Sequence, residues 1–455
     1  MNSKPHICYR PKYCWIENEI KEGFQIAVNQ KGQIVDCQPV KETSDSKENV
    51  VLLKDQVLFP GLVNAHSHAF QRSLRGFTQI RSPKGKDHFW TWREAMYKIA
   101  NALSPEDIYL VAAFCFLEMI ASGITTVGEF HYLHHLPSGE TYQNSNELGL
   151  QVLRAARDVG IRICLLDVAY EKGEMKRFCD ESIDSYLKRI DLLQKELGEI
   201  QSMGIAPHSI RAVSLLWLKE IAKYNSNRNF PIHMHLHEQP KEIEMCAKEY
   251  SGKTPLEVVF ESGLMNHSLT AVHATHTLSK DQDLLQENKV MVCACPSTER
   301  DLGDGILDAL ALAKRNISIC LGTDSQVMIN LWEDARELEY HLRLKTLERN
   351  VLNQHPAHFL IKCMTSNGSK ALGLKVGELQ KGAPADMVSI DLNHLSLIGH
   401  SPKTLPSQMI FSLALGAIKN VWVNGKQVFK DGRHPKQEVI QKEFQTLQYK
   451  INSLM

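Results

Sequence analysis

The sequence predicts an α/β fold: a (β/α)8 TIM barrel with a small β-sandwich domain formed by the N- and C-terminal segments. Between residues 60 and 376, short apolar runs alternate with longer helical patterns, which is typical of βα units and a parallel sheet. Eight such runs occur, the strand number of a TIM barrel. Residues 1–59 and 377–455 instead alternate short strands with turns, so we assign these two segments to the small β domain.

Composition excludes several classes of function. The chain has 455 residues, of which 43% are hydrophobic, as in a globular protein with a large core. Lys and Arg total 52, as do Asp and Glu, and this balance predicts no nucleic-acid partner. No run approaches the roughly 18 apolar residues of a membrane span, and the first residues lack the apolar core of a signal peptide. The 11 cysteines are scattered through apolar segments, which favours reduced thiols and a cytoplasmic location.

In the predicted small domain, strand-like runs and turn residues alternate at both ends of the chain. Asn424-Gly425 is a strong hairpin signal, and a turn is expected at 29–32. The final segment, 436–454, has an amphipathic helical pattern. The expected strands of this domain are 24–28, 34–37, 50–53, 385–390, 417–423 and 427–429.

The barrel strands and one of the barrel helices carry clear boundary signals. Ser104 is an expected N-cap that is followed by a proline, and the helix that it begins should end near Gly123. The predicted barrel strands are 62–66, 125–130, 162–168, 204–207, 231–235, 269–273, 290–294 and 317–322.

Polar side chains recur where these strands end. In a TIM barrel the chemistry takes place at the C-terminal ends of the strands. Residues that are costly to bury would not gather at one end of the strands by chance. The sequence therefore predicts a polar pocket formed by His66 and His68 after the first strand, Glu129, His131 and Tyr132 after the second, His208 and Arg211 after the fourth, His233, His235, His237 and Glu238 after the fifth, His273 and His276 after the sixth, and Asp324 after the eighth.

Four of these side chains could hold a metal ion. His66 and His68 are two residues apart, so they point to the same side of a strand. With one histidine of the fifth strand and Asp324, they offer three imidazoles and a carboxylate, a ligand set that suits zinc. Fe2+ and Mn2+ accept similar ligands and remain alternatives. By themselves, His66 and His68 could equally be two histidines of a loop. An acid after a strand, such as Asp324, is by itself more often a helix cap.

Three further residues have both a chemical and a structural interpretation. Glu238 could transfer a proton beside a metal, or it could be a charge-paired structural acid. His273 could orient or deprotonate a water, or it could be a hydrogen-bonded core histidine. Arg211 suits a carboxylate ligand, although it could be a surface arginine. The helical metalloprotease motif H-E-x-x-H is excluded, because position 241 is lysine.

Motifs along nearly the whole chain resemble those of the amidohydrolase superfamily. They are the first-strand segment 60–68, His235-x-x-Glu238, Val272-His273-Ala274, Gly322-Thr323-Asp324 and the return segment 377–386. Within the superfamily, residues 66–72, 89–94, 129–135 and 206–211 resemble the formimidoylglutamate deiminase family. That family hydrolyses N-formimino-L-glutamate to N-formyl-L-glutamate and ammonia in histidine degradation.

The resemblance implies a site and a substrate. It implies one Zn2+ per subunit on His66, His68, His235 and Asp324, with Glu238 and His273 as catalytic groups and Asp324 helping to take the proton. It implies Gln71, Tyr132, His208 and Arg211 as contacts of a small dicarboxylate amidine substrate, and a homodimer. Arg72, Arg81 and Arg93 are further candidates to bind its carboxylates. No lysine ends the fourth strand, as it does in two-metal members, and His208 in its place favours one metal.

One departure and two alternatives stay open at this point. The family pattern has a small residue where this chain has His237, so either His235 or His237 could be the ligand of the fifth strand. One alternative is another deaminase of the superfamily that acts on guanine or an adenosine derivative. Such a site needs an aromatic slot, and the predicted pocket residues are mostly charged and polar. The other alternative is a non-catalytic metabolite-binding barrel, from which loss of some ligands would be expected.

Overall fold

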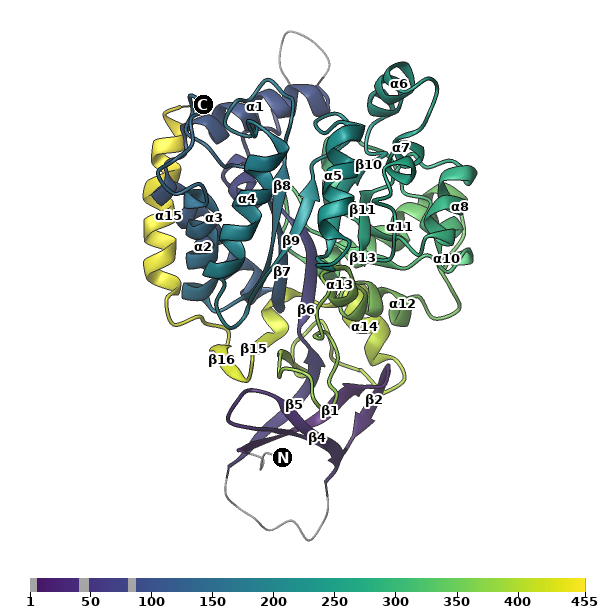
Figure 1. Ribbon diagram of the computed structural model, residues 1–455. Helices are drawn as coiled ribbons and strands as arrows, with labels where there is room; N and C mark the ends of the chain where they lie inside the picture. Colours follow the sequence, from purple (N-terminus) through teal and green to yellow (C-terminus); the bar gives the residue numbers. More distant parts are fainter. Residues whose placement is uncertain (1–5, 41–48, 81–86, 455) are drawn as a thin grey trace.

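A computed structural model describes residues 6–40, 49–80 and 87–454 of the chain. Eight parallel strands form a barrel in which each strand pairs with the next one along the chain (Figure 1). The ends of the barrel meet where Ser67 bridges Asp324. The predicted barrel and its eight strands are confirmed, and the strands are β6 (Leu62–Ser67), β7 (Ile124–His131), β8 (Arg162–Ala169), β9 (Gln201–Pro207), β10 (Ile232–Leu236), β11 (Leu269–His273), β12 (Met291–Ala294) and β13 (Ile319–Leu321).

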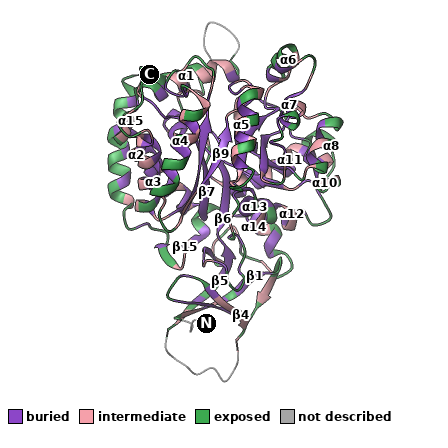
Figure 2. Cartoon of the chain, in the orientation of Figure 1, coloured by how far each residue is buried: buried purple, intermediate pink, exposed green. Residues whose placement is uncertain are grey.

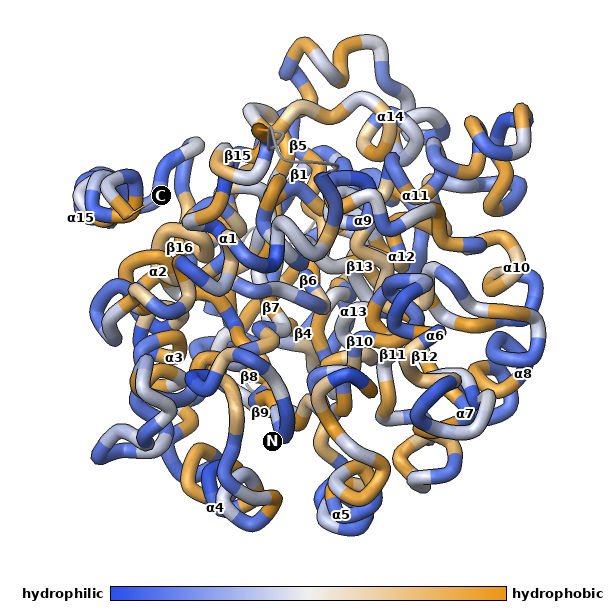
Figure 3. Tube along the Cα trace, turned by 90° about the horizontal axis from the view of Figure 1, so that it is seen from above, coloured by the Kyte–Doolittle hydropathy of each residue, from blue (hydrophilic) through white to orange (hydrophobic). Residues whose placement is uncertain are grey.

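Helices surround the barrel strands, as the view from above shows (Figure 3). The Ser104 side chain accepts a hydrogen bond from the Asp107 N–H, and Gly123 adopts a φ of 87° just beyond the helix, as the sequence predicts. The helices are α1 (Phe89–Ala102), α2 (Pro105–Ala121), α3 (Glu147–Val159), α4 (Ile183–Leu193), α5 (Leu215–Asn225), α6 (Pro240–Glu249), α7 (Pro255–Glu261), α8 (Ser279–Glu287), α9 (Pro296–Leu302), α10 (Ala309–Lys314), α11 (Leu331–Thr346), α12 (Pro356–Cys363), α13 (Ser366–Ala371), α14 (Leu405–Ser412) and α15 (Gln437–Asn452), with short 3-10 turns at Ala69–Leu74, Gln194–Glu196 and Leu415–Ala417.

A second sheet combines strands from both ends of the chain, which confirms the predicted small β domain. It is a mixed sheet in which β1 and β5 run parallel and the other pairs are antiparallel. Its strands are β1 (Ile7–Ile16), β2 (Glu19–Glu22), β3 (Phe24–Val28), β4 (Ile34–Pro39), β5 (Val50–Pro60), β14 (Met387–Asp391), β15 (Ile418–Val423) and β16 (Lys426–Phe429).

The sequence analysis missed the central strand β1 and its partner β2. Pro11 interrupts the hydrogen-bonding pattern of β1, and the pairing register with β5 shifts between Pro11 and Tyr13. Proline cannot donate to a ladder and is normally found at bulges or edges, so its presence disguised this strand. The sequence analysis predicted only 50–53 of β5, because polar residues interrupt the apolar pattern before the strand ends at Pro60.

The last helix, α15, lies along α2 on the outside of the barrel (Figure 1). The Phe444 ring stacks on that of Phe114 with centroids 4.1 Å apart, and Lys450 pairs with Asp107. The C-terminal segment therefore contacts both the mixed sheet and the barrel. The division of the chain into a small β domain (1–59 with 377–455) and a barrel domain (60–376) stays a prediction.

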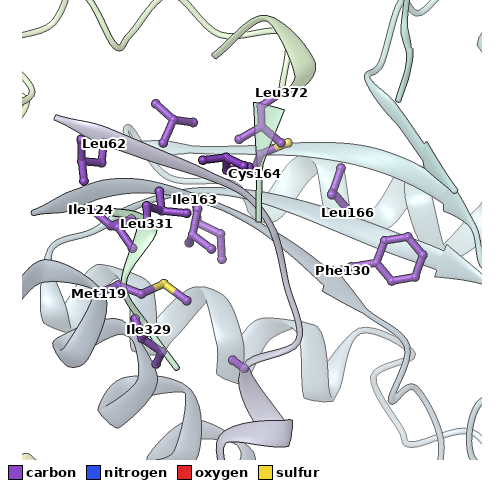
Figure 4. Packing of buried hydrophobic residues seen from close by; sticks show 14 of the residues in the cluster. Leu62, Met119, Ile124, Phe130, Ile163, Cys164, Leu166, Ile329, Leu331 and Leu372 are labelled. Carbon is purple, nitrogen blue, oxygen red and sulfur yellow. The ribbon is translucent and has the colours of Figure 1, made fainter. Parts of the chain in front are cut away.

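Burial fixes the barrel strands in place. Their residues are almost all buried, whereas the outer faces of the helices are exposed (Figure 2). Leu62, Ile124, Ile163 and Leu166 belong to one continuous hydrophobic cluster (Figure 4). This packing accounts for the continuous apolar runs in the sequence, because both faces of a parallel strand are covered. No helix among the described residues is both long and apolar enough to cross a membrane.

Candidate metal centre and active site

Four side chains that are far apart in the sequence converge at the C-terminal ends of three strands. One ligand atom each of His66, His68, His235 and Asp324 lies within 4.8 Å of the others, and all four residues are buried. The Nε2 atom of His66 lies 3.2 Å from the Nε2 atoms of both His68 and His235. Tetrahedral Zn–N bonds of about 2.0–2.1 Å would separate two nitrogens by roughly 3.3 Å. The four side chains therefore fit a divalent metal ion.

Backbone carbonyls orient two of these imidazoles. Nδ1 of His68 lies 2.9 Å from the carbonyl oxygen of Phe130, and Nδ1 of His235 lies 3.0 Å from that of His208. Each Nδ1–H donates to its carbonyl, which leaves the Nε2 lone pair directed at the common centre, as in protein metal sites. Burial lowers the pKa of His66 to about 3. The imidazole of His66 is thus neutral, as a metal ligand must be.

Asp324 reaches the centre because the last barrel strand packs closely on the first. Its Oδ1 lies 3.1 Å from His68 Nε2, and a Cβ atom on Gly322 would lie only 2.7 Å from the Cβ of His66. The Asn64 side chain accepts a hydrogen bond from the Thr323 N–H at 3.0 Å and donates to the Thr323 hydroxyl at 2.7 Å. These contacts explain the residue types of the Gly322-Thr323-Asp324 motif. Glycine permits the close approach of the last strand to the first, and threonine holds the two strands together through its hydrogen bonds.

Of the three histidines near the end of β10, only His235 joins the metal group. His233 lies 2.9 Å from the carbonyl oxygen of Ala371, away from the centre. His237 has a φ of 56°, and its ring lies beside the Leu256 N–H and Asp281. The reversal of the chain at His237 breaks the alternation that the sequence analysis assumed, so His237 does not share a side with His235.

Glu238 and His273 lie next to Asp324 and face one another. His273 Nε2 is 3.7 Å from Glu238 Oε1 and 3.6 Å from Asp324 Oδ2. On the other side of the ring, His273 Nδ1 is 3.4 Å from Glu299 Oε1. Burial opposes a charge on His273, but hydrogen bonding to Glu299 and the charges of Glu238 and Asp324 raise its pKa to about 10. A cation near Asp324 would offset this effect and lower that pKa.

The sequence analysis missed three buried acids around this pair: Glu242, Glu299 and Asp304. Glu242 accepts a hydrogen bond from the N–H of Glu238 at 3.0 Å, and burial raises its pKa to about 7. Glu299 also accepts a hydrogen bond from the Cys295 N–H at 2.9 Å. All three lie several residues beyond the end of a barrel strand, so the inspection of strand ends did not include them.

Other polar residues predicted at the strand ends lie outside the metal group. Glu129 accepts hydrogen bonds from the Ser67 hydroxyl at 2.5 Å and from the Ala69 N–H at 2.6 Å, so it supports the loop after β6. His276 lies 2.6 Å from the carbonyl oxygen of Asp304. His131 is buried and contacts the His134 ring.

A cavity of about 60 Å3 opens beside the centre and contains most of the predicted substrate contacts. Gln71 Nε2 donates to the Tyr132 hydroxyl at 2.7 Å, which leaves Gln71 Oε1 buried without a hydrogen-bond partner among the described residues. Arg211 Nη2 pairs with Glu238 Oε2 at 2.5 Å, and Arg211 Nη1 is likewise buried without a partner in the described part of the chain. The His208 ring lies 4.9 Å from that of His235, between centroids. Gln71 Oε1 and Arg211 Nη1 are therefore available to bind a polar, anionic ligand.

Helix α1 forms one wall of the cavity. Phe89, Trp92, Arg93, Met96 and Tyr97 recur at helical spacing and line it together. The predicted charged and polar residues line this cavity, but the sequence analysis did not link the helical pattern of α1 to the pocket and so missed its aromatic side chains. Tyr132, Tyr170 and Phe178 complete the aromatic lining.

The three additional arginine candidates have different surroundings. Arg93 lines the cavity, and its only described ion pair is a 3.9 Å contact with the exposed Glu174. Arg72 pairs with Glu118, and its guanidinium carbon lies 5.0 Å and 5.3 Å from the ring centroids of Phe114 and Phe444, so it has a structural contact instead. Arg81 lies outside the described residues.

The Asp304→Asn substitution, at a buried acid, is expected to stabilise the protein at alkaline pH. Burial and the charge of Glu238 raise the pKa of Asp304 from 3.8 to about 9. Keeping this proton in the folded state costs free energy that grows as the pH rises from about 4 to about 9. The asparagine side chain is neutral throughout, so the free energy of unfolding of the variant should exceed the wild-type value by about 1–3 kcal/mol at pH 8 and by less at pH 5.

Urea unfolding at both pH values measures this difference. Asp301→Asn, at an acid bonded to Gln79 in an exposed contact, is the matched control and should show no such pH dependence. A gain that is equal at pH 5 and pH 8 would contradict the explanation, since it would not follow the titration of Asp304.

Comparisons with known proteins agree with this fold. The amidohydrolase family matches residues 57–428. A formimidoylglutamate deiminase of Pseudomonas aeruginosa is 33% identical over 395 residues, which are 84% of this chain and 86% of the relative. A 5-methylthioadenosine/S-adenosylhomocysteine deaminase of Halothermothrix orenii is 27% identical over 441 residues, 96% of this chain and 94% of the relative. The crystal structure of an amidohydrolase from Brucella melitensis has a TM-score of 0.87 at 29% identity and covers 98% of this chain and 99% of its own.

Proposed function

Because the chain belongs to the amidohydrolase family, we propose that it hydrolyses N-formimino-L-glutamate to N-formyl-L-glutamate and ammonia. One observation carries the choice of substrate: a buried guanidinium nitrogen, Arg211 Nη1, has no partner among the residues that the structure describes, and this arginine lies beside the carboxylate of Glu238. The 33% identical relative bears the corresponding name. In this proposal the protein acts in histidine degradation in the cytoplasm, as a homodimer with one zinc ion per subunit.

The two carboxylates of the substrate would be bound by two arginines. Arg211 and Arg93 both line the cavity, and a guanidinium binds a carboxylate through two parallel hydrogen bonds. The unpartnered Oε1 of Gln71 would accept a hydrogen bond from a substrate N–H. Tyr132 holds the Gln71 side chain, and His208 lies next to the metal ligand His235. Contacts with both ends of a flexible substrate would orient its formimino carbon toward the centre.

His66, His68, His235 and Asp324 would hold the metal. A divalent metal in such a site supplies a water whose pKa is lowered toward about 7. His273 Nε2 and Asp324 Oδ2, which lie 3.6 Å apart, would accept the proton of the attacking water. The water oxygen forms a bond to the formimino carbon as the C=N double bond becomes single.

Glu238 would complete the proton transfer. Its carboxylate faces His273 at 3.7 Å and is fixed by Arg211 at 2.5 Å. Glu238 would pass this proton to the formimino nitrogen. The proton of the new hydroxyl group would follow by the same route as the C=O double bond forms, so that the C–N bond breaks and ammonia leaves as NH3. The aromatic wall would exclude bulk water from this step and strengthen its electrostatic interactions.

A second candidate function is deamination of an adenosine derivative. The observation that favours it is the aromatic lining of Phe89, Trp92, Tyr97, Tyr170 and Phe178, against which a purine could stack. Relatives with 27% and 30% identity are named 5-methylthioadenosine/S-adenosylhomocysteine deaminases. The two arginines favour the dicarboxylate, since 5-methylthioadenosine has no carboxylate and S-adenosylhomocysteine has only one for the two guanidinium groups.

Ammonia release by the zinc-loaded protein distinguishes these functions. We expect kcat/KM for N-formimino-L-glutamate to exceed that for 5-methylthioadenosine, S-adenosylhomocysteine or guanine by about 10³-fold or more, because a site built for hydrogen bonding rejects ligands that leave its polar groups unpaired. Metal-stripped protein serves as the blank. Faster release from a purine would overturn the proposed substrate and favour the second function. No release from any of these compounds, with zinc bound, would exclude both.

A further inference from the structure

Asp324 has a second carboxylate oxygen that faces away from the three imidazoles of the metal centre. Oδ1 lies near His66 and His68, at 3.5 and 3.1 Å, whereas Oδ2 lies 3.6 Å from His273 Nε2. His273, Cys295 and Asp324 form a second buried group, in which one ligand atom of each lies within 4.8 Å of the others. Asp324 thus belongs to two adjacent groups of ligand-type atoms.

The His273 imidazole is already oriented as a ligand of this second group. Its Nε2 atom is buried and has no hydrogen-bond partner within residues 6–40, 49–80 and 87–454, while its Nδ1 faces the Glu299 carboxylate at 3.4 Å. Histidine ligands usually donate their other ring N–H to such a carboxylate, which fixes the tautomer and the ring. Glu238 Oε1 lies 3.7 Å from the same Nε2, but Glu238 does not belong to the group.

Cys295 distinguishes the second group from the first. It follows the end of β12 and precedes α9, and its thiol is fully buried. A thiolate is a soft ligand that favours Zn2+ and still more Cd2+ over Mg2+ or Ca2+. Glu238 and Asp324 both line the open cavity, so an ion can approach the group from the substrate side.

We propose that His273, Cys295 and Asp324 form a second site for a soft divalent cation, and that its occupation inhibits the enzyme. Binding would release the thiol proton of Cys295 to solvent and use the lone pair of His273 Nε2. Asp324 would then bridge two ions. The inhibitory effect rests on the proposed function, because His273 and Glu238 could no longer transfer protons.

Cadmium titration of the one-zinc protein tests the site without relying on turnover. We expect one equivalent of Cd2+ to produce ultraviolet thiolate-to-cadmium absorbance while the bound zinc stays in place. Ammonia release should fall in parallel with the rise in absorbance. Cys295→Ser and Cys295→Ala should abolish the absorbance and weaken the inhibition by at least about tenfold, with basal activity unchanged.

Cys293→Ser is the matched control, because Cys293 is equally buried but lies outside the group. It should keep both the absorbance and the inhibition. Absence of the absorbance in the wild-type protein, or its persistence in both Cys295 variants, would overturn the site. Absorbance without inhibition would leave the site standing but overturn its inhibitory role. Absence of turnover with every substrate would overturn the proposed function, while the absorbance would still test the site.

Discussion

The Glu238→Gln protein is expected to bind zinc normally and to have a kcat lowered by about 10²–10⁴-fold, the usual contribution of a proton-transfer group. Glutamine preserves the size of the side chain and can still accept a hydrogen bond from Arg211. It cannot carry a proton from the attacking water to the leaving nitrogen. Steady-state kinetics of ammonia release, together with the zinc content of the purified protein, measure the two effects separately.

Glu242→Gln is the control for this substitution. Glu242 is buried four residues further along and accepts the N–H of Glu238, a bond that glutamine can retain. We expect less than about a tenfold loss of kcat, because this residue positions Glu238 and does not transfer the proton. A Glu238→Gln protein with wild-type turnover would remove Glu238 from the mechanism.

The His235→Asn protein is expected to lose its zinc and, with it, essentially all activity. His235 Nε2 lies 3.2 Å from that of His66 at the centre of the ligand group, and asparagine cannot place a nitrogen lone pair there. A site with three ligands in place of four should bind zinc at least about 10²-fold more weakly. Competition with a chromophoric chelator measures this affinity.

His237→Asn makes the same change two residues away. Because the His237 ring faces Asp281 and α7, this protein should retain its zinc affinity. Asparagine also tolerates the positive φ at this position better than most residues. Zinc loss in the His237 variant and retention in the His235 variant would show that the ligand of β10 has been misassigned.

The barrel was predictable from the sequence because its strands are buried on both faces. Each one appears as a short apolar run, such as 62–66 or 162–168, with few competing polar positions. The proximity of the His66 and His68 side chains was predictable for a related reason: two residues at alternate positions share a side of a strand. Asp324 alone did not predict a metal site, and it became a candidate ligand only in combination with these histidines.

The residues that were missed depend on tertiary contacts. Glu299 lies on α9 and meets His273 only because the two strands before them pair in the barrel. The aromatic wall comes from α1, whose pattern of 89, 92, 96 and 97 resembles that of any helix packed on a core. Only the folded structure shows that this helix faces a cavity. His237 was ambiguous because a single positive φ reverses the alternation on which the prediction depended.

The close packing of Gly322 on His66 has a consequence for assembly of the protein. Three of the four candidate metal ligands, His66, His68 and Asp324, lie at the ends of the first and the last barrel strands, so the candidate centre spans the seam at which the barrel closes. During synthesis, His66 and His68 emerge more than 250 residues before Asp324. The complete centre can therefore form only after the last strand has docked, and a bound ion would fasten that seam. If this centre binds a metal ion, the ion would be acquired late, after the barrel has closed, and its loss should first loosen the contact between β6 and β13.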